Sequence, residues 1–194
     1  MKTPALCFLF AISACVPAAL FAQTTVSGVT YEPIVDVRGG RLQLNGAGTR
    51  YKAVFKVYAA GLYLGKKAGT ADEAIKAAGA KRMHVTMLRE IDSAELGRMF
   101  SRGMEDNMDK TAFSRLIPGV IRMSQIFSDT KRLKAGDNFL IDWVPGAGTV
   151  ITINGVAQGE PFKEPEFYNA MLRLWLGPNP ADWQLKDALL GQRA

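Results

Sequence analysis

The chain has 194 residues, of which 48% are hydrophobic and 22% charged, and its formal net charge is +6. Basic and acidic residues are interspersed without a continuous basic stripe, which argues against a nucleic-acid partner and leaves open a weak attraction to acidic membrane surfaces. One histidine, His84, and two cysteines, Cys7 and Cys15, are too few for a zinc site with the usual ligands, and no phosphate-binding loop is present. We therefore expect no metal and no cofactor.

Residues 1–22 have the features of a secretory signal peptide. Lys2 supplies a positive charge, the apolar run 4–21 follows, and a small residue ends the segment. Its removal would place the protein in a periplasm or outside the cell. A lipoprotein modified at Cys15 and an uncleaved membrane anchor are the alternatives, but the apolar run continues past Cys15, which favours ordinary cleavage. Residues 23–194 contain no repeat or linker and are expected to form one domain.

Most elements of the domain are predicted to be β-strands, because β-branched and aromatic residues gather in short runs bounded by Gly and Pro. These runs cover residues 26–37, 41–45, 51–64, 82–89, 137–143, 148–153 and 156–158. Gly46 and Gly48 predict a turn between the second and third strands, since glycine tolerates turn dihedrals that other residues avoid. Arg50 would directly follow this turn, on a strand that also carries Tyr58.

Helical periodicity occurs between and after the strands. The predicted helices cover residues 72–78, 92–108, 112–126, 165–176 and 180–190. The clearest is 92–108, in which apolar side chains recur at the 3.6-residue period after a capping residue at Asp92 or Ser93. Pro118 is expected to break or kink the helix over 112–126. Antiparallel strands with helices between them predict an α+β fold.

One polar side chain, Asn107, lies on the apolar stripe of the helix over 92–108 and is expected to be buried. A buried amide without hydrogen-bond partners costs about 1–3 kcal/mol, so Asn107 either bonds a neighbouring backbone group or faces a polar ligand group. The first interpretation is favoured, because buried polar groups usually find protein partners. Gly103, on the same stripe, leaves space for a close helix contact or for a ligand.

The segment 44–64 carries the most specific pattern in the chain. It contains Gly46-Ala-Gly48-x-Arg50, followed by Phe55-Lys-Val-Tyr58-x-x-Gly61-x-Tyr63-Leu64. This pattern resembles the signature region of the chalcone isomerase superfamily, in particular its bacterial, secreted chalcone isomerase-like branch. The resemblance extends to residues 100–107, 143–149, 153–155 and 172–190. It implies a large antiparallel β-sheet covered on one face by helices, an open-faced β-sandwich, with a ligand cleft between the two layers.

The resemblance also implies which residues surround a ligand. In chalcone isomerases these are an Arg after the Gly-rich segment, a Thr on the strand, a Tyr and an Asn on a helix, and a Ser or Thr on a late helix. Arg50 and Asn107 match this pattern. Tyr58 replaces the Thr, Phe100 replaces the Tyr and Leu174 replaces the Ser or Thr. Loss of a hydroxyl that polarises a substrate carbonyl typically costs about 10²–10³ in rate, so efficient chalcone cyclisation is not expected.

Tyr58 resembles instead the fatty-acid-binding members of the superfamily, in which an Arg and a Tyr hold a carboxylate. On one straight strand, Arg50 and Tyr58 would lie about 26 Å apart, so they can meet only if the chain folds back between them. Lys52 and Lys56 share the strand parity of both residues and are alternative sources of the cation.

Three functional hypotheses follow. The favoured one is a secreted, non-catalytic protein that binds a fatty acid or similar lipophilic carboxylate in the cleft. The second is a chalcone isomerase-type intramolecular lyase for an unknown enone or phenolic substrate. The third is a structural or interaction module whose cleft is filled by its own side chains, which a tight contact between Gly103 and Leu174 would favour. The sequence indicates no oligomeric state.

Overall fold

The computed structural model describes residues 23–192, and the predicted signal peptide lies outside this range. The strands are β1 (Thr24–Val26), β2 (Val29–Tyr31), β3 (Ile34–Val37), β4 (Gly40–Lys52), β5 (Phe55–Leu64), β6 (Lys81–Met87), β7 (Ile91–Asp92), β8 (Arg132–Leu133), β9 (Asn138–Val144), β10 (Gly148–Ile153) and β11 (Val156–Ala157). The helices are α1 (Ala71–Lys76), α2 (Ser93–Glu105), α3 (Lys110–Thr130), α4 (Pro165–Leu176) and α5 (Trp183–Leu189).

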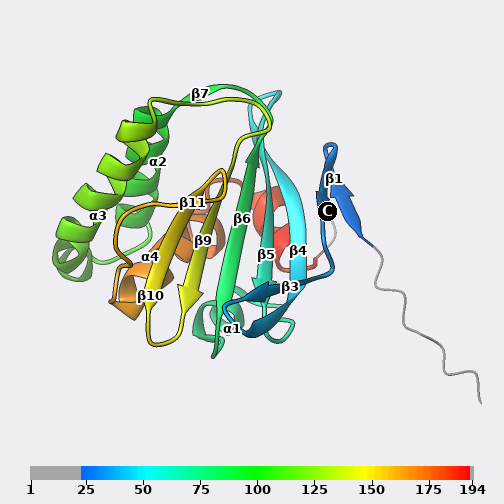
Figure 1. Ribbon diagram of the computed structural model, residues 1–194, viewed down its shortest axis with the longest axis horizontal. Helices are drawn as coiled ribbons and strands as arrows, with labels where there is room; N and C mark the ends of the chain where they lie inside the picture. The colour runs from blue at the N-terminus through cyan, green and yellow to red at the C-terminus, as the bar shows by residue number, and fades with distance from the viewer. Residues whose placement is uncertain (1–22, 193–194) are drawn as a thin grey trace, which may run out of the picture.

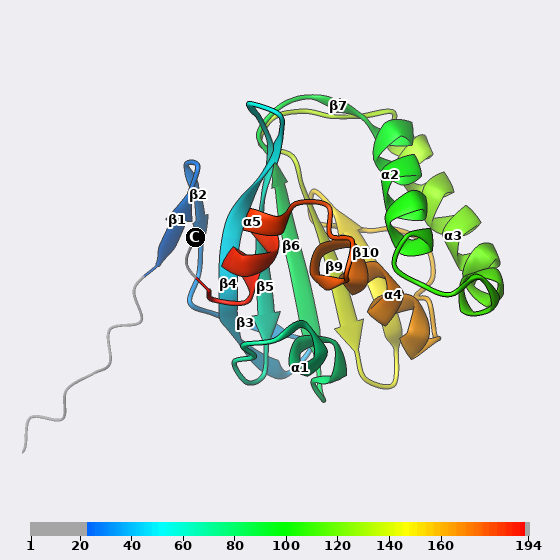
Figure 2. The ribbon, with the colours of Figure 1, turned by 180° about the vertical axis from the view of Figure 1, so that it is seen from behind.

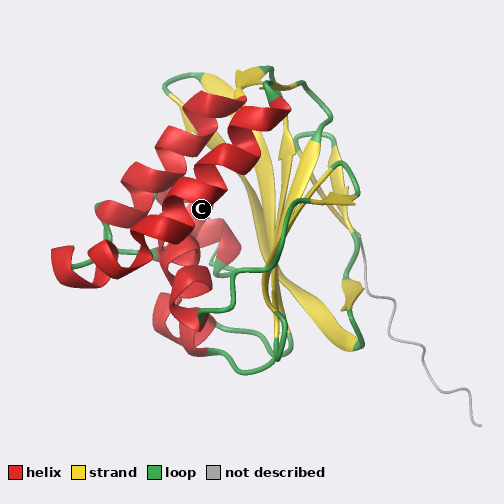
Figure 3. Cartoon of the chain, turned by 60° about the vertical axis from the view of Figure 1, so that its left-hand side comes forward, coloured by secondary structure: helices red, strands yellow, loops and turns green. Residues whose placement is uncertain are grey.

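Seven strands form one large sheet in the order β11-β10-β9-β6-β5-β4-β3 (Figure 1). Every neighbouring pair in it is antiparallel. The helices gather on one face of this sheet (Figure 3). The predicted fold class, an α+β chain with a large antiparallel sheet covered on one face by helices, is therefore confirmed. None of the helices within residues 23–192 is long and apolar enough to cross a membrane.

The main hydrophobic core lies between the large sheet and the helices. Phe100 of α2 contacts Phe127 and Phe139 edge-on, with ring centroids 5.1 and 5.7 Å apart. It also contacts Trp175 of α4, at 5.8 Å. All four side chains are fully buried, and burial of each contributes about 1.5–3 kcal/mol to folding. The centre of the space between sheet and helices is thus filled by the protein's own aromatic rings.

The structure corrects the predicted turn at Gly46 and Gly48. β4 continues through both glycines, and the chain reverses after it at Ala53, whose φ is +54°. Helix α5 accounts for the glycines, because it crosses β4 so closely that a Cβ at Gly48 would lie 2.7 Å from the Cβ of Ala188. A glycine within a strand can mark such a close approach as well as a turn.

This reversal also removes the separation expected between Arg50 and Tyr58. The two residues are register partners in the antiparallel ladder of β4 and β5. Directly opposite residues have their Cβ atoms about 4.5–5.5 Å apart. The register shifts immediately beyond this pair, where β5 has the extra residue Val57, and such bulges redirect neighbouring side chains.

Several other elements also differ from prediction. The predicted strand 26–37 is divided into β1, β2 and β3, because the chain turns at Ser27 and Gly28 and then passes Pro33, which has no N–H for a ladder. Helix α3 is continuous from Lys110 to Thr130, so of the predicted break or kink at Pro118 the break is wrong. It also ends at Thr130, four residues past its predicted end. The short strands β7 and β8 were not predicted. Apart from β4 and β5, whose bounds moved with the turn, the remaining strands and helices begin and end within three residues of their predicted positions.

Candidate ligand-binding site

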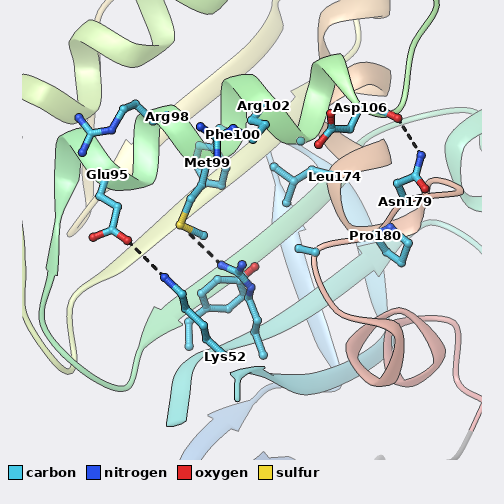
Figure 4. A pocket seen from close by; sticks show the side chains of 14 residues that line it. Lys52, Glu95, Arg98, Met99, Phe100, Arg102, Asp106, Leu174, Asn179 and Pro180 are labelled. Atoms are coloured by element: carbon cyan, nitrogen blue, oxygen red, sulfur yellow. Dashed lines mark hydrogen bonds and ion pairs between the residues drawn. The ribbon is translucent and has the colours of Figure 1, made fainter. Parts of the chain in front are cut away.

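A cavity of about 350 Å³ opens between the β4–β5 hairpin, helix α2 and the loop from α4 to α5 (Figure 4). Small-molecule pockets commonly have volumes of about 300–1,000 Å³. The hairpin contributes Arg50, Lys52 and Tyr58 to its lining, and the loop contributes Asn179, Pro180 and Ala181. The cavity is therefore built from segments that are distant in the sequence.

Helix α2 supplies one whole wall of the cavity. Its lining residues lie on one face, at positions three or four apart: Glu95, Arg98, Met99, Arg102 and Gly103. Asp106 follows just past the end of the helix. The helix begins as predicted, because the side chain of Asp92 accepts a hydrogen bond from the backbone N–H of Glu95. The sequence analysis did not select Arg98 and Arg102 as site residues. The signal that could have identified them is their four-residue spacing, which places both on one face of the helix.

Arg50 brings a positive charge to the cavity. Its side chain is half-buried, with the guanidinium carbon 5.5 Å from the centre of the Tyr58 ring. Nη1 donates to the sulfur of Met99 at 3.8 Å, which is a weak acceptor, and Nε is buried without a partner. No carboxylate within residues 23–192 forms an ion pair with Arg50. The arrangement therefore leaves Arg50 able to bind an anion in the cavity.

Tyr58 brings a hydroxyl group to the same place. Its side chain is fully buried, and its oxygen accepts a hydrogen bond of 3.0 Å from Nε1 of Trp175. The hydroxyl proton can still be donated, because a phenol both donates and accepts. Burial raises the pKa of Tyr58 above its usual value of 10, and the nearby charge of Arg50 opposes this shift only in part. Tyr58 is thus a neutral hydrogen-bond donor at physiological pH.

Phe100 and Leu174 form the apolar part of the lining. Leu174 also packs directly on α2, where a Cβ at Gly103 would lie 2.8 Å from its Cδ1. Gly103 therefore serves a close helix contact while it borders the cavity. Neither Phe100 nor Leu174 offers a hydroxyl group to a bound molecule, so the polar chemistry of the cavity comes from other residues.

Asn107 is not among the residues that line the cavity. It lies just beyond the end of α2, where its amide nitrogen donates to the backbone oxygens of Gly103 and Asn179 at 2.8 and 2.9 Å. Its amide oxygen accepts from the backbone N–H of Asn179 at 2.8 Å. The amide therefore bonds backbone groups, as the favoured interpretation expected, and ties α2 to the loop before α5.

The mouth of the cavity is charged. Lys52 and Glu95 form an exposed ion pair of 3.7 Å that spans from the hairpin to α2 (Figure 4). With Arg50, Arg98, Arg102 and Asp106, the lining contains four cationic and two acidic side chains. This excess of positive charge attracts anions to the mouth.

His84 lies away from this cavity. It packs edge-on against Tyr31, at 5.3 Å, in a second, smaller core on the opposite face of the sheet. Within residues 23–192, no group of His, Cys, Asp and Glu is arranged to hold a metal ion.

Comparison with known proteins assigns the family. A family model described as chalcone isomerase-like matches residues 23–191. The chain belongs to the chalcone isomerase-like family. A fatty-acid binding protein of Arabidopsis thaliana has a similar fold, with a TM-score of 0.69 at 16% sequence identity over 84% of this chain and 92% of that one. No curated protein sequence matches this chain.

In this member of the chalcone isomerase-like family, the residues selected from the sequence have two different positions. Arg50, Tyr58, Phe100 and Leu174 line one cavity, and Asn107 supports the chain behind it. Lys52, considered as an alternative cation, also lines the cavity, whereas Lys56 does not.

Proposed function

We propose that this protein binds a fatty acid or a similar lipophilic carboxylate, without catalysing a reaction on it. The proposal depends chiefly on the pairing of Arg50 with Tyr58. A guanidinium without a carboxylate partner and a neutral phenol donor meet at a cavity whose deeper lining is apolar. A monocarboxylate with an aliphatic chain has the complementary distribution of charge and apolar surface.

The two ends of such a ligand would meet different groups. The guanidinium of Arg50 can hold a carboxylate through two parallel hydrogen bonds, and Tyr58 adds a third donor. Met99, Phe100 and Leu174 would contact the aliphatic chain, at about 0.8 kcal/mol for each CH₂ removed from water. The similar fold of a plant fatty-acid binding protein supports this class of ligand.

A catalytic role has less support from the cavity. The positions of Phe100 and Leu174 lack the hydroxyl groups that would stabilise an oxyanion on an enone. The histidine of the chain, His84, packs in the other core and so supplies no acid or base. Turnover of a panel of chalcones that Arg50→Ala abolishes would instead support the lyase alternative.

A module without a ligand is the second candidate, and two observations favour it. Leu174 packs tightly on Gly103, and aromatic side chains fill the centre between the helices and the sheet. On this alternative the cavity would be an unused hollow at the margin of the core, and no carboxylate would bind.

We also propose that residues 1–22 are removed on export and that the mature protein acts in a periplasm or outside the cell. The family match begins at Gln23 and so excludes the apolar leader. A lipoprotein modified at Cys15 is the alternative.

The first prediction concerns the Arg50–Tyr58 pair. Arg50→Gln is expected to weaken binding of a C16 fatty acid by about tenfold to a hundredfold, because a hydrogen bond to a charged group is worth about 1.5–3 kcal/mol. Tyr58→Phe is expected to weaken it by a smaller factor. The measurement is displacement of a fluorescent fatty acid from the delipidated mature protein, with mass spectrometry of solvent extracts from the undelipidated protein.

Matched controls are available on the same strands. Arg41→Gln changes an exposed cation of β4, and Tyr63→Phe changes a tyrosine of β5 that faces the other core; neither is expected to alter the affinity. The methyl ester of the same acid is expected to bind as weakly to the wild type as to Arg50→Gln. Equal affinity of the acid for the wild type and for Arg50→Gln would refute the proposed site. Absence of any binding would favour the module without a ligand.

A further inference from the structure

The turn of the β4–β5 hairpin exposes large apolar side chains to solvent. In the segment Tyr51–Lys56, here termed the hairpin tip, Val54 is 82% exposed and Phe55 is 61% exposed. β6 pairs with β5 only from Tyr58 onward, so the tip extends past the neighbouring strand. The tip reaches the same end of the molecule as β7 (Figure 2).

Basic side chains surround this apolar turn. Lys52 and Lys56 are exposed on its two strands, and the guanidinium carbon of Arg89 lies 5.8 Å from the centre of the Phe55 ring. Within residues 23–192, neither Lys56 nor Arg89 forms an ion pair with a carboxylate.

The acidic side chains of the same region have other partners. Glu95 pairs with Lys52 and Glu90 with Arg132, while Asp92 caps α2 and Asp182 caps α5. The tip itself contains two lysines and no acidic residue, so its exposed apolar groups lie directly among basic side chains. That combination is typical of segments that bind the interface of a membrane containing anionic lipids.

The tip is also tied to the rest of the molecule through its backbone. Tyr51 pairs with Lys56, and Lys52 with Phe55, on either side of the turn. The backbone N–H of Tyr51 donates to Oδ2 of Asp182 at 2.9 Å, which fixes the hairpin to the start of α5. A partner would thus meet a preorganised surface, with little loss of conformational freedom on binding.

We propose that the hairpin tip docks on the surface of a membrane rich in anionic lipid. Val54 and Phe55 enter the headgroup region, and Lys56 and Arg89 contact lipid phosphates. Arg50 and Lys52 lie on the same hairpin and line the cavity, so docking brings the cavity mouth to the lipid surface, where a lipophilic carboxylate is taken up or released. Only this last step depends on the proposed function; docking itself stands on the tip alone.

The test is sedimentation of the delipidated mature protein with vesicles. Vesicles of equal parts phosphatidylglycerol and phosphatidylcholine are expected to bind the wild type more strongly than phosphatidylcholine alone, and added salt is expected to weaken this binding. Val54→Ser with Phe55→Ser is expected to reduce it at least tenfold. Lys56→Gln with Arg89→Gln is expected to reduce it by about fivefold for each charge.

A matched control distinguishes binding through the tip from non-specific adsorption of exposed apolar side chains to the vesicles. Ile121 and Val156 are 65% and 63% exposed elsewhere on the molecule, so Ile121→Ser with Val156→Ser removes comparable apolar surface. The proposal is overturned if the anionic vesicles bind no wild-type protein, or if the control variant loses as much binding as the tip variant. It is also overturned if the tip variant converts a dimer to a monomer without changing vesicle binding.

The same variants separate this proposal from the proposed function. Val54→Ser with Phe55→Ser is expected to bind a fatty acid in solution as the wild type does, since neither residue lines the cavity. Vesicle binding by a protein that binds no fatty acid would uphold docking and refute the ligand proposal. Fatty-acid binding without any vesicle binding would uphold the ligand proposal and refute docking.

Discussion

At Arg50, the guanidinium lies half-buried beside a phenol ring, and one of its donors meets only a thioether sulfur. A buried donor without a partner costs free energy that a bound acceptor would recover. The residue was identifiable from its place in the family pattern, as was Tyr58. Their mutual contact was not, because the sequence suggested a turn at the wrong glycines and placed both residues on one strand.

His84 gives a prediction for the pH dependence of folding. Burial, assisted by the nearby charge of Arg82, lowers the pKa of His84 to about 4, whereas an unfolded histidine has a pKa of about 6.5. The unfolded state therefore binds a proton more readily, so this contribution to stability is fully present above pH 6.5 and is lost as the pH falls towards 4.

The expected size of this contribution is about 3 kcal/mol for a shift of this extent. Urea unfolding at a series of pH values is expected to show a shallower decline for His84→Gln than for the wild type over this interval. NMR titration of the imidazole gives the pKa directly. A value near 6.5 in the folded protein would contradict the prediction.

Among the elements, α5 packs closely on β4 next to the cavity. α5 begins at Trp183, directly after Asp182, whose side chain caps the helix and also accepts a hydrogen bond from the backbone N–H of Tyr51. The residues just before it, Pro180 and Ala181, line the cavity. Displacement of α5 from the strand would therefore alter the cavity together with the fold.

Gly48→Ala tests this contact. The added methyl group would meet the Cβ of Ala188 at 2.7 Å, so the free energy of unfolding is expected to fall by about 1–3 kcal/mol, as overpacking usually costs. Addition of Ala188→Gly is expected to restore part of the loss. Gly65→Ala is the control, because nothing lies within 4 Å of a Cβ there. Urea denaturation measures all three, and equal stabilities of the Gly48 and Gly65 variants would refute the contact.

Over the whole molecule, the cavity and the hairpin tip occupy neighbouring parts of one end, while the helix–sheet interior is filled with aromatic side chains. A fatty acid would therefore bind at the margin of the core, with part of its chain near the mouth. This arrangement differs from a cleft through the centre of the two layers. A ligand at the margin can pass to or from a neighbouring surface more easily than one enclosed between the helices and the sheet.

Export and removal of the leader, residues 1–22, are predictions about the whole chain. Expression of the full chain in a bacterial host, followed by fractionation, is expected to yield a periplasmic protein whose N-terminus is Gln23. N-terminal sequencing and intact-mass measurement decide the outcome. A lipid-modified N-terminus at Cys15 would establish the lipoprotein alternative, and an intact leader would refute cleavage.

Local patterns in the sequence were sufficient to determine the fold class, many element bounds and the start of α2, and the resemblance to a known family identified four residues of the cavity. Hydrophobic periodicity and turn chemistry act over a few residues, so they can be read from neighbouring positions alone. The tertiary structure decided the rest. It showed that Gly46 and Gly48 accommodate α5, that Arg50 faces Tyr58, and that Asn107 bonds Asn179. Each of these depends on contact between segments distant in the chain, which no local pattern of side chains specifies.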